Sequence, residues 1–347
     1  STLAANSLGR EFAEWIVVDG PGSSNLQADE QFFKSEHYGI SGTLFGRGWD
    51  ENVKHAVQIA KGQYSWERVE LTEDEYRRLK DAGIPIEDVQ VEGSWLWRKY
   101  NYGNRAVTQQ KLQEQIIKTF RKDGLIPTTV NLVGWSRGAV SCHMMANQML
   151  NDKELKNVPA NIFAVDPVPG PMNYKDERAL LGANVREYVG FFARDERSKG
   201  FSCLIPRTHG STRTHIYPMA GRHATLVGNA AANGNKGPKI LAAPGLIVRH
   251  FAETCLRRWG VKLDKTLDLS KAELENHHNS LKNDDAKYLQ MRKESYTYFT
   301  ELDQGERYVT HGRDGTAFSK VQGGHMRPAT GLSASLTLEA SSYQEIR

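Results

Sequence analysis

The sequence predicts an α/β protein in which helices cover both faces of a mostly parallel sheet. Strand-like apolar runs alternate with amphipathic helical segments between about residues 108 and 221, and this alternation is typical of parallel sheets. Of the 347 residues, 39% are hydrophobic and 25% are charged, which is enough apolar material for a large buried core. The three cysteines form no CxxC motif, so we expect a reducing compartment and neither a disulfide scaffold nor a zinc module.

The N-terminal part of the chain contains one predicted strand and two predicted helices. The strand "EWIVVDG" covers residues 14–20 and ends in the turn sequence "DGPGSSN". A helix is predicted over residues 49–62, because apolar side chains recur on one face and Gly62 is suited to end it. A second helix is predicted over residues 71–83, which begin with a capping-box pattern. The apolar positions of the first helix are Val53, Ala56, Val57 and Ala60.

Helices and strands alternate through the centre of the chain. After about residue 240 the pattern becomes helical and then polar and irregular. We therefore predict a core domain over residues 1–240, with an insertion at about 40–108, and a helical and irregular C-terminal extension over 241–347 that packs on the core. The predicted central helices cover 108–124 and 137–151, and the predicted strands cover 128–135, 160–166, 186–195 and 213–221.

Composition and spacing exclude several functional classes. The net charge of +4 is mild, and no block of lysine and arginine is dense enough to indicate nucleic-acid binding. No metal-ligand spacing accompanies the histidines and cysteines, so we expect no metal and no cofactor. The chain lacks the run of about 18 apolar residues that a membrane-spanning helix needs. Its first residues lack the basic start and apolar centre of a secretory signal. A soluble protein is therefore expected.

The segment "LVGWSRGA", residues 132–139, carries the pattern G-x-S-x-G between a predicted strand and a predicted helix. This pattern is the nucleophile elbow of α/β-hydrolases, in which a sharp, strained turn exposes a serine hydroxyl at the carboxyl edge of the sheet. Gly134 and Gly138 are expected to remove side chains that would collide there, and Ser136 is the predicted nucleophile. The N–H of Arg137 is the expected first oxyanion-hole donor. The alternative is a tight turn with a bystander serine.

A serine nucleophile needs a base and an acid that orients the base, and in α/β-hydrolases both follow the serine in the chain. His223 comes just after a predicted strand, in a glycine-flanked loop, and is the candidate base. His215 alternates with apolar residues inside that strand, so we interpret it as structural. We predict that the His223 imidazole lies within hydrogen-bond reach of the Ser136 hydroxyl.

Two aspartates at the ends of strands are candidates for the acid. Asp195 follows the second strand beyond the nucleophile strand, which is the usual position of the acid in this fold. Asp166 follows the strand before it and is the alternative acid. We therefore predict that the Asp195 carboxylate binds the other imidazole nitrogen of His223, and that Asp166 has a turn or hydrogen-bonding role.

The second oxyanion donor is expected in the loop "DGPGSSN". The proline in this loop has no N–H, so Gly20, Gly22 or Ser23 must supply the donor. The segment "WLWRKYNY" contains Trp95 and Trp97, which are candidates for contact with a lipid interface. The alternative for that segment is a strand with one face in the core.

Six segments taken together resemble one known hydrolase family. They are similar to the α/β-hydrolase family that includes lipase effectors of bacterial type VI secretion. The resemblance consists of scattered motifs between about residues 14 and 230, and the elbow, the "DER" and the histidine segments are its specific parts. It implies a phospholipase with a Ser-Asp-His triad, formed here by Ser136, Asp195 and His223. The segments are "IVVDGPGS", "FGRGWDENVKHAV", "LVGWSRGA", "FAVDPVPG", "FFARDERSKGF" and "IYPMAGRHATLVGN".

These observations favour a serine esterase, and in particular a phospholipase A of a bacterial effector or toxin. The resemblance implies a phospholipid or other acyl-ester substrate, peripheral contact with a membrane, and a secretion-system or immunity partner. It also implies non-classical secretion and action at the membranes of a target cell. The first alternative is another acyl hydrolase with the same triad, such as a thioesterase, amidase or peptidase. The second is an inactive binding protein, against which the complete set of Ser136, Asp195 and His223 argues.

Overall fold

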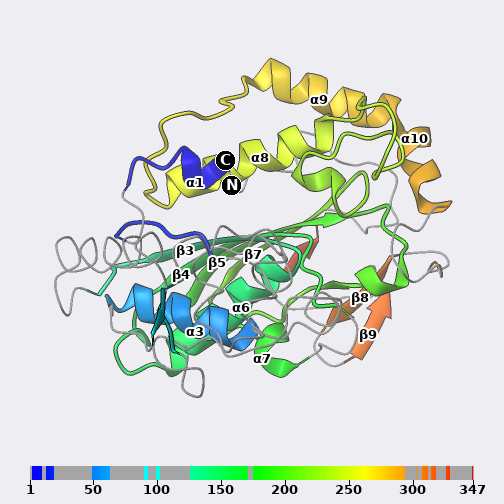
Figure 1. Cartoon of the computed structure of the whole chain (residues 1–347). Coiled ribbons are helices and arrows are strands. Elements are labelled where there is room, and N and C mark those ends of the chain that lie inside the picture. The colour runs from blue at the N-terminus through cyan, green and yellow to red at the C-terminus, as the bar shows by residue number, and fades with distance from the viewer. Residues whose placement is uncertain are drawn as a thin grey trace. The chain divides into compact units, whose positions relative to one another are not determined.

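The chain contains two compact units. One comprises Ser1–Leu8 with Thr128–Arg347, and the other comprises Gly9–Pro127. Their helices and strands are labelled in Figure 1. The computed structural model describes residues 2–9, 13–18, 49–62, 90–92, 99–101, 126–170, 175–293, 302, 307–311, 314–317, 326–328 and 346.

The described part of the Gly9–Pro127 unit contains a helix and a hairpin. Helix α3, Trp49–Ala60, confirms the predicted helix, because all four of its predicted apolar positions are buried. Gly62 follows this helix with a φ of 72°, a conformation that glycine adopts readily at a helix end. Strands β1, Gln90–Glu92, and β2, Lys99–Asn101, pair antiparallel.

The strand predicted over residues 14–20 is not formed by its described part. Within residues 13–18, Trp15 makes only an isolated bridge, and its indole Nε1 donates to the carbonyl oxygen of Gly9 at 2.8 Å. Val17 is exposed. A β-branched run forms a strand when it packs on a pleated, half-buried surface, so this prediction is wrong for lack of such burial. The helices predicted over 71–83 and 108–124 lie outside the described residues.

The larger unit is built on a parallel sheet with the strand order β10-β7-β5-β4-β3 (Figure 1). All neighbouring strands in this sheet are parallel. The four strands predicted in the centre of the chain are present, so the predicted parallel α/β architecture is confirmed. The strands are β3, Val130–Trp135; β4, Ala160–Val165; β5, Val185–Ala193; β7, Arg213–Met219; and β10, Met326–Pro328.

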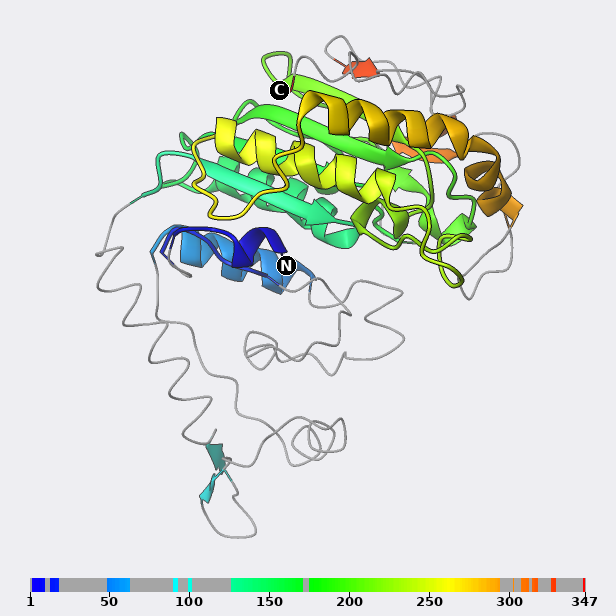
Figure 2. The same cartoon turned by 90° about the horizontal axis from the view of Figure 1, so that it is seen from above.

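Helices cover both faces of this sheet (Figures 1 and 2). Helix α6, Arg137–Asn151, packs on β3 and β4 from one side, and α8, Ala243–Arg258, lies on the other side with α9, Lys271–Asn283, beside it. Strand β4 is buried along its whole length, as expected for a central strand covered on both faces. The core on the α8 side is aromatic, and the Phe191 and Phe251 rings stack with centroids 6.1 Å apart.

A second sheet has the strand order β6-β8-β9. Strands β6 and β8 are parallel, whereas β8 and β9 are antiparallel. No helix in the described part of the chain is long and apolar enough to cross a membrane. The bounds of these strands and of the short elements are β6, Cys203–Leu204; β8, Tyr308–His311; β9, Asp314–Ala317; α1, Thr2–Ala5; α7, Asp176–Ala179; η3, Lys199–Phe201; η4, Thr225–Val227; α10, Asp285–Gln290; and η5, Met291–Lys293.

Candidate active site

Ser136 lies in the turn between the end of β3 and the start of α6, as predicted. Its φ of 58° and ψ of −127° form a strained combination for a residue with a side chain. Two backbone hydrogen bonds hold the turn: the N–H of Ser136 donates to Val165 O at 3.0 Å, and the N–H of Val168 donates to Ser136 O at 3.3 Å. The adjacent strand β4 and the chain that follows it therefore maintain the backbone conformation that a nucleophile elbow requires.

The two glycines of the elbow motif differ in what surrounds them. A Cβ at Gly134 would lie 2.3 Å from the carbonyl oxygen of Gly138 and 2.4 Å from the amide nitrogen of Ala139, and neither backbone atom can move aside. A Cβ at Gly138 would meet nothing within 4 Å. The predicted role in avoiding a collision is confirmed for Gly134 and wrong for Gly138, because the strand residue faces the helix backbone whereas the helix residue faces open space.

His223 follows strand β7, and a glycine turn directs it across the carboxyl edge of the sheet. Gly221 has a φ of 103°, and a Cβ there would lie 2.6 Å from Thr225 Cγ2, so the turn requires glycine. Strand β5 lies between β7 and β4 in the sheet. His223 nevertheless reaches the end of β4, where its Nδ1 lies 2.6 Å from Oδ2 of Asp166.

Asp166 therefore occupies the position that was predicted for Asp195. The prediction that Asp195 binds the His223 imidazole is wrong, and the alternative acid makes this contact. Oδ2 of Asp195 accepts a hydrogen bond from the N–H of Gly221 at 2.8 Å, and its Oδ1 accepts one from Arg292 Nε at 2.7 Å. The Asp195 carboxylate thus joins the end of β5 to the turn after β7 and to the η5 segment.

Strand register explains why Asp166 is the carboxylate that belongs with Ser136. Strands β3 and β4 are adjacent, and Trp135 pairs with Val165, so Ser136 and Asp166 leave the sheet side by side. Asp195 follows β5, which is one strand further from the serine. Asp166 also has a left-handed φ of 44°, so the chain turns directly at the end of β4.

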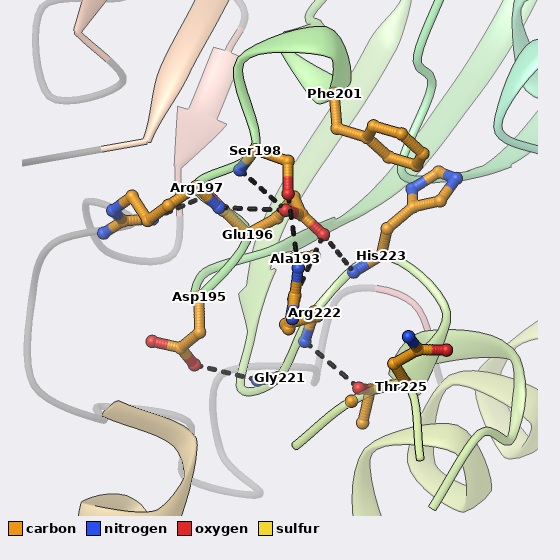
Figure 3. Close-up of polar contacts among 12 residues, drawn as sticks. Ala193, Asp195, Glu196, Arg197, Ser198, Phe201, Gly221, Arg222, His223 and Thr225 are labelled. Carbon is orange, nitrogen blue, oxygen red and sulfur yellow. Dashed lines mark hydrogen bonds and ion pairs between the residues drawn. The ribbon is translucent and has the colours of Figure 1, made fainter. Parts of the chain in front are cut away.

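Glu196 holds the backbone of the loop that carries His223 (Figure 3). One of its carboxylate oxygens accepts from the N–H of His223 at 3.4 Å. The other accepts from the N–H groups of Arg197 and Ser198 at 3.0 and 2.8 Å. Arg222 Nε lies 3.5 Å from the oxygen that binds His223, and Glu196 is fully buried. The "DER" segment therefore fixes the histidine loop through its backbone, a role that its position next to Asp195 did not reveal.

Two aromatic side chains contact the His223 imidazole. The Trp135 ring stacks on it with centroids 4.8 Å apart, and Trp135 Nε1 donates to His223 O at 3.2 Å. Phe201 makes an edge contact at a centroid distance of 4.8 Å. Trp135 directly precedes Ser136, so this stack places His223 beside the elbow. Among the described residues no hydrogen bond joins the Ser136 hydroxyl to the His223 imidazole, so the predicted contact is not confirmed. Catalytic hydrogen bonds of this kind often form only when substrate binds.

Asp166 is fully buried and binds the guanidinium of Arg307 with both oxygens. Burial alone would raise the pKa of Asp166, but the Arg307 cation and the hydrogen bond from His223 outweigh it and lower this pKa from 3.8 to about 2. Asp166 is therefore ionised at neutral pH and suited to orient an imidazole. Arg307 follows Asp166 by 141 residues, and no local motif in the sequence marks it.

Arg137 is the first residue of α6 and directly follows Ser136. Its position at the helix N-terminus beside Ser136 agrees with the predicted role as an oxyanion donor. The other predicted oxyanion donors, Gly20 and Gly22, and the predicted lipid-contact residues, Trp95 and Trp97, lie outside the described residues.

The other candidate groups in the described structure do not form a competing site. Burial raises the pKa of each of the three cysteines to about 12, so none is a thiolate near neutral pH. No group of three or more His, Cys, Asp or Glu residues in the described ranges could hold a metal ion. His215 lies inside β7, as predicted, with Nε2 3.2 Å from a carboxylate oxygen of Glu187 near the start of β5. The cysteines are Cys142, Cys203 and Cys255.

Comparison with known proteins adds no family to this geometry. No family model matches the sequence, and no curated protein matches it. The candidate site is therefore defined by its own residues: Ser136 at a strained turn, and His223 bound to the buried Asp166 at the same edge of the sheet.

Proposed function

We propose that this protein is a serine hydrolase that cleaves carboxylic esters, with Ser136 as nucleophile, His223 as base and Asp166 as acid. One observation carries the proposal: a strained serine at a strand-to-helix turn shares the carboxyl edge of a parallel sheet with a buried His-Asp pair. Such backbone strain costs about 1–3 kcal/mol and clusters at functional sites. The strain, the aligned strand ends and the buried pair all support the same chemistry.

The proposed reaction uses these groups in two steps. Ser136 Oγ attacks the ester carbonyl carbon while His223 Nε2 takes the hydroxyl proton, and the imidazolium then gives this proton to the departing alcohol. A water molecule next attacks the acyl-enzyme, with His223 again taking and returning the proton, so that a carboxylic acid is released and Ser136 is restored. Asp166 selects the tautomer with a proton on Nδ1 and stabilises the imidazolium.

The developing oxyanion would be stabilised at the N-terminus of α6. The backbone N–H of Arg137 is the proposed first donor, because Arg137 directly follows Ser136 at the start of α6, where the helix dipole favours negative charge. Gly20 and Gly22 remain the predicted source of a second donor. Removal of one donor of this type costs about 10²–10³-fold in rate in serine hydrolases.

The substrate class that we propose is a phospholipid, cleaved as by a phospholipase A of a bacterial effector or toxin. Two exposed apolar side chains near the site suit an acyl chain. Trp135, which stacks on His223, is 41% exposed, and Val227, four residues after His223 in η4, is 47% exposed. The resemblance of the elbow and histidine segments to secreted bacterial lipases supports the same class.

A fluorophosphonate probe tests the nucleophile directly. We expect the probe to label the wild type on Ser136 and to leave Ser136→Ala unlabelled, with an unchanged melting temperature for the variant because only a partly exposed hydroxyl is lost. Ser280→Ala is the matched control, since Ser280 lies on α9, where its hydroxyl donates to Asn276 O. Labelling that persists in Ser136→Ala would show that another residue is the nucleophile.

A substrate panel tests the class. The wild type and Ser136→Ala are incubated with neutral phospholipids, anionic phospholipids, phosphoinositides, thioesters, amides and peptides, and the products are resolved by mass spectrometry. Release of a fatty acid and a lysophospholipid by the wild type alone supports a phospholipase A. Turnover restricted to thioesters, amides or peptides supports another acyl hydrolase. Binding of lipid without turnover or probe labelling supports an inactive hydrolase fold.

A further inference from the structure

Arg307 contacts several groups that surround the His223 imidazole. Its Nη1 donates to Asp166 Oδ1 and to Ala193 O, the latter at 2.7 Å. Its Nη2 donates to Asp166 Oδ2 at 2.9 Å and to Phe201 O at 2.8 Å. Asp166 binds the imidazole through Nδ1, and Phe201 contacts the ring by its edge. One buried guanidinium therefore holds two of the residues that fix the position of the candidate base.

The second sheet places Arg307 at this point. Strand β8 pairs in parallel with β6, and Cys203 is opposite Val309. Arg307 lies two residues before Val309, and Phe201 lies two residues before Cys203. The parallel register therefore places Arg307 opposite Phe201. The guanidinium is 1% exposed and carries a full positive charge, because its pKa is raised by Asp166 despite burial.

We propose that Arg307 is a positioning residue that holds Asp166 and Phe201 around His223. The proposal rests on the serine hydrolase function proposed above. A misplacement of about 1 Å at a catalytic group can cost on the order of 10²-fold in rate, so a buried guanidinium that binds two neighbours of the imidazole bears directly on the rate of Ser136 acylation.

Charged and titratable groups from four other parts of the fold face Asp166 and Arg307. Burial raises the pKa of the Cys203 thiol to about 12 and raises that of the Tyr188 phenol, so both are neutral over the relevant pH range. Arg307 is therefore the cation that both oxygens of Asp166 bind directly. The facing groups are His223 after β7, Cys203 in β6, Tyr188 in β5, and Glu196 and Arg197 after β5.

Two substitutions separate the charge of Arg307 from its geometry. Arg307→Gln removes the charge and keeps an amide donor. Arg307→Lys keeps the charge but loses the planar guanidinium that binds the carboxylate in a bidentate manner. The rate constant for fluorophosphonate labelling of Ser136 and the melting temperature are measured in the full chain. We expect Arg307→Gln to lower this rate constant by on the order of 10²-fold. We expect Arg307→Lys, which keeps a cation beside Asp166, to recover part of the loss and to remain about tenfold below the wild type.

Arg258→Gln is the matched control, because Arg258 binds both oxygens of the buried Glu187 in the same bidentate geometry. It is expected to lower the melting temperature and to leave the labelling rate constant unchanged. If Arg307→Gln behaves like Arg258→Gln, Arg307 is only structural and the proposal is overturned. If Arg307→Gln does not fold, Arg307→Lys decides: a rate constant equal to that of the wild type overturns the proposal, and one lowered by about tenfold supports it.

The wild-type measurement separates this proposal from the function on which it rests. Absence of Ser136 labelling in the wild type would contradict the proposed hydrolase function. Labelling of the wild type with unchanged labelling rate constants in both Arg307 variants would contradict the role of Arg307 alone.

Discussion

The two ends of the parallel sheet each carry a buried carboxylate bound by a histidine and an arginine, but among the described residues only the carboxyl end also carries a serine at a strained turn. At the carboxyl end, Asp166 binds His223 and Arg307. At the amino end, Glu187 binds Arg258 and a histidine of β7. Burial opposes the ionisation of both carboxyls, but their hydrogen bonds and ion pairs lower the pKa of each to about 2.

The difference lies in what surrounds each histidine. His215 is inside strand β7, and the carboxylate that it faces also binds Trp259 Nε1 at 2.8 Å and Arg213 Nη2 at 3.0 Å. His223 instead lies on a loop beyond its strand and stacks on Trp135, next to a strained serine at a helix N-terminus. A buried histidine–carboxylate pair can therefore serve the fold alone, and a reactive site needs a nucleophile presented beside it.

The largest expected effect is on catalytic activity, which should depend on Asp166 and not on Glu187. Asp166→Asn should lower the rate of Ser136 acylation by about 10⁴-fold, as the equivalent change does in serine proteases, because the neutral amide favours the wrong tautomer. Glu187→Gln should leave the rate within a few-fold of wild type and destabilise the fold by about 2 kcal/mol, because the charge-assisted hydrogen bonds of Arg258 and Trp259 to the buried carboxylate are weakened. Probe labelling and urea unfolding of both variants measure these effects.

Asp195→Asn is the control within the carboxyl end. Asp195 binds Gly221, Arg194 and Arg292 rather than the imidazole, so its substitution should cost far less activity than that of Asp166. An inactive Asp195→Asn variant together with an active Asp166→Asn variant would show that Asp195 is the acid, as the sequence favoured. That result would also remove the contrast between the two ends of the sheet.

A second effect concerns the strained turn at Ser136, which has no counterpart beside His215 in the part of the chain that the structure describes. Gly134→Ala should destabilise the protein by about 3 kcal/mol, because its Cβ would collide with the backbone of Gly138 and Ala139. Gly138→Ala is the matched variant and should leave stability unchanged or raise it by about 0.5–1 kcal/mol, because the added methyl meets open space in a helix. Equal melting temperatures for the two variants would contradict the difference in packing.

The smallest effect is a difference in acid stability. A carboxyl whose pKa is lower in the folded than in the unfolded protein contributes stability that is complete above its unfolded pKa and is lost as pH falls through its folded pKa. The loss should begin below about pH 4.5 for Glu187 and below about 3.8 for Asp166, and continue toward pH 2. The free energy of unfolding, measured by urea titration between pH 5 and 2.5, should fall less steeply in Glu187→Gln than in Asp166→Asn. The difference between the two variants should be less than about 1 kcal/mol. Parallel curves for the two variants would refute this difference.

The sequence by itself determined the local features of the larger unit. Apolar runs of strand length between helical segments predicted β3, β4, β5 and β7, and G-x-S-x-G placed Ser136 at the turn between a strand and a helix. The glycine-flanked position after a strand identified His223. These features could be predicted because they depend on residues that are neighbours in the chain, through side-chain periodicity and backbone sterics.

Only the tertiary structure decided which carboxylate binds the imidazole and what holds that carboxylate. Asp166 and Asp195 both follow strands, and the choice between them depends on the Gly221 turn, which carries His223 past the end of β5 to β4. Arg307 reaches Asp166 through the pairing of β8 with β6, across 141 residues. Contacts between residues so far apart depend on strand order and register, which periodicity and local motifs do not encode.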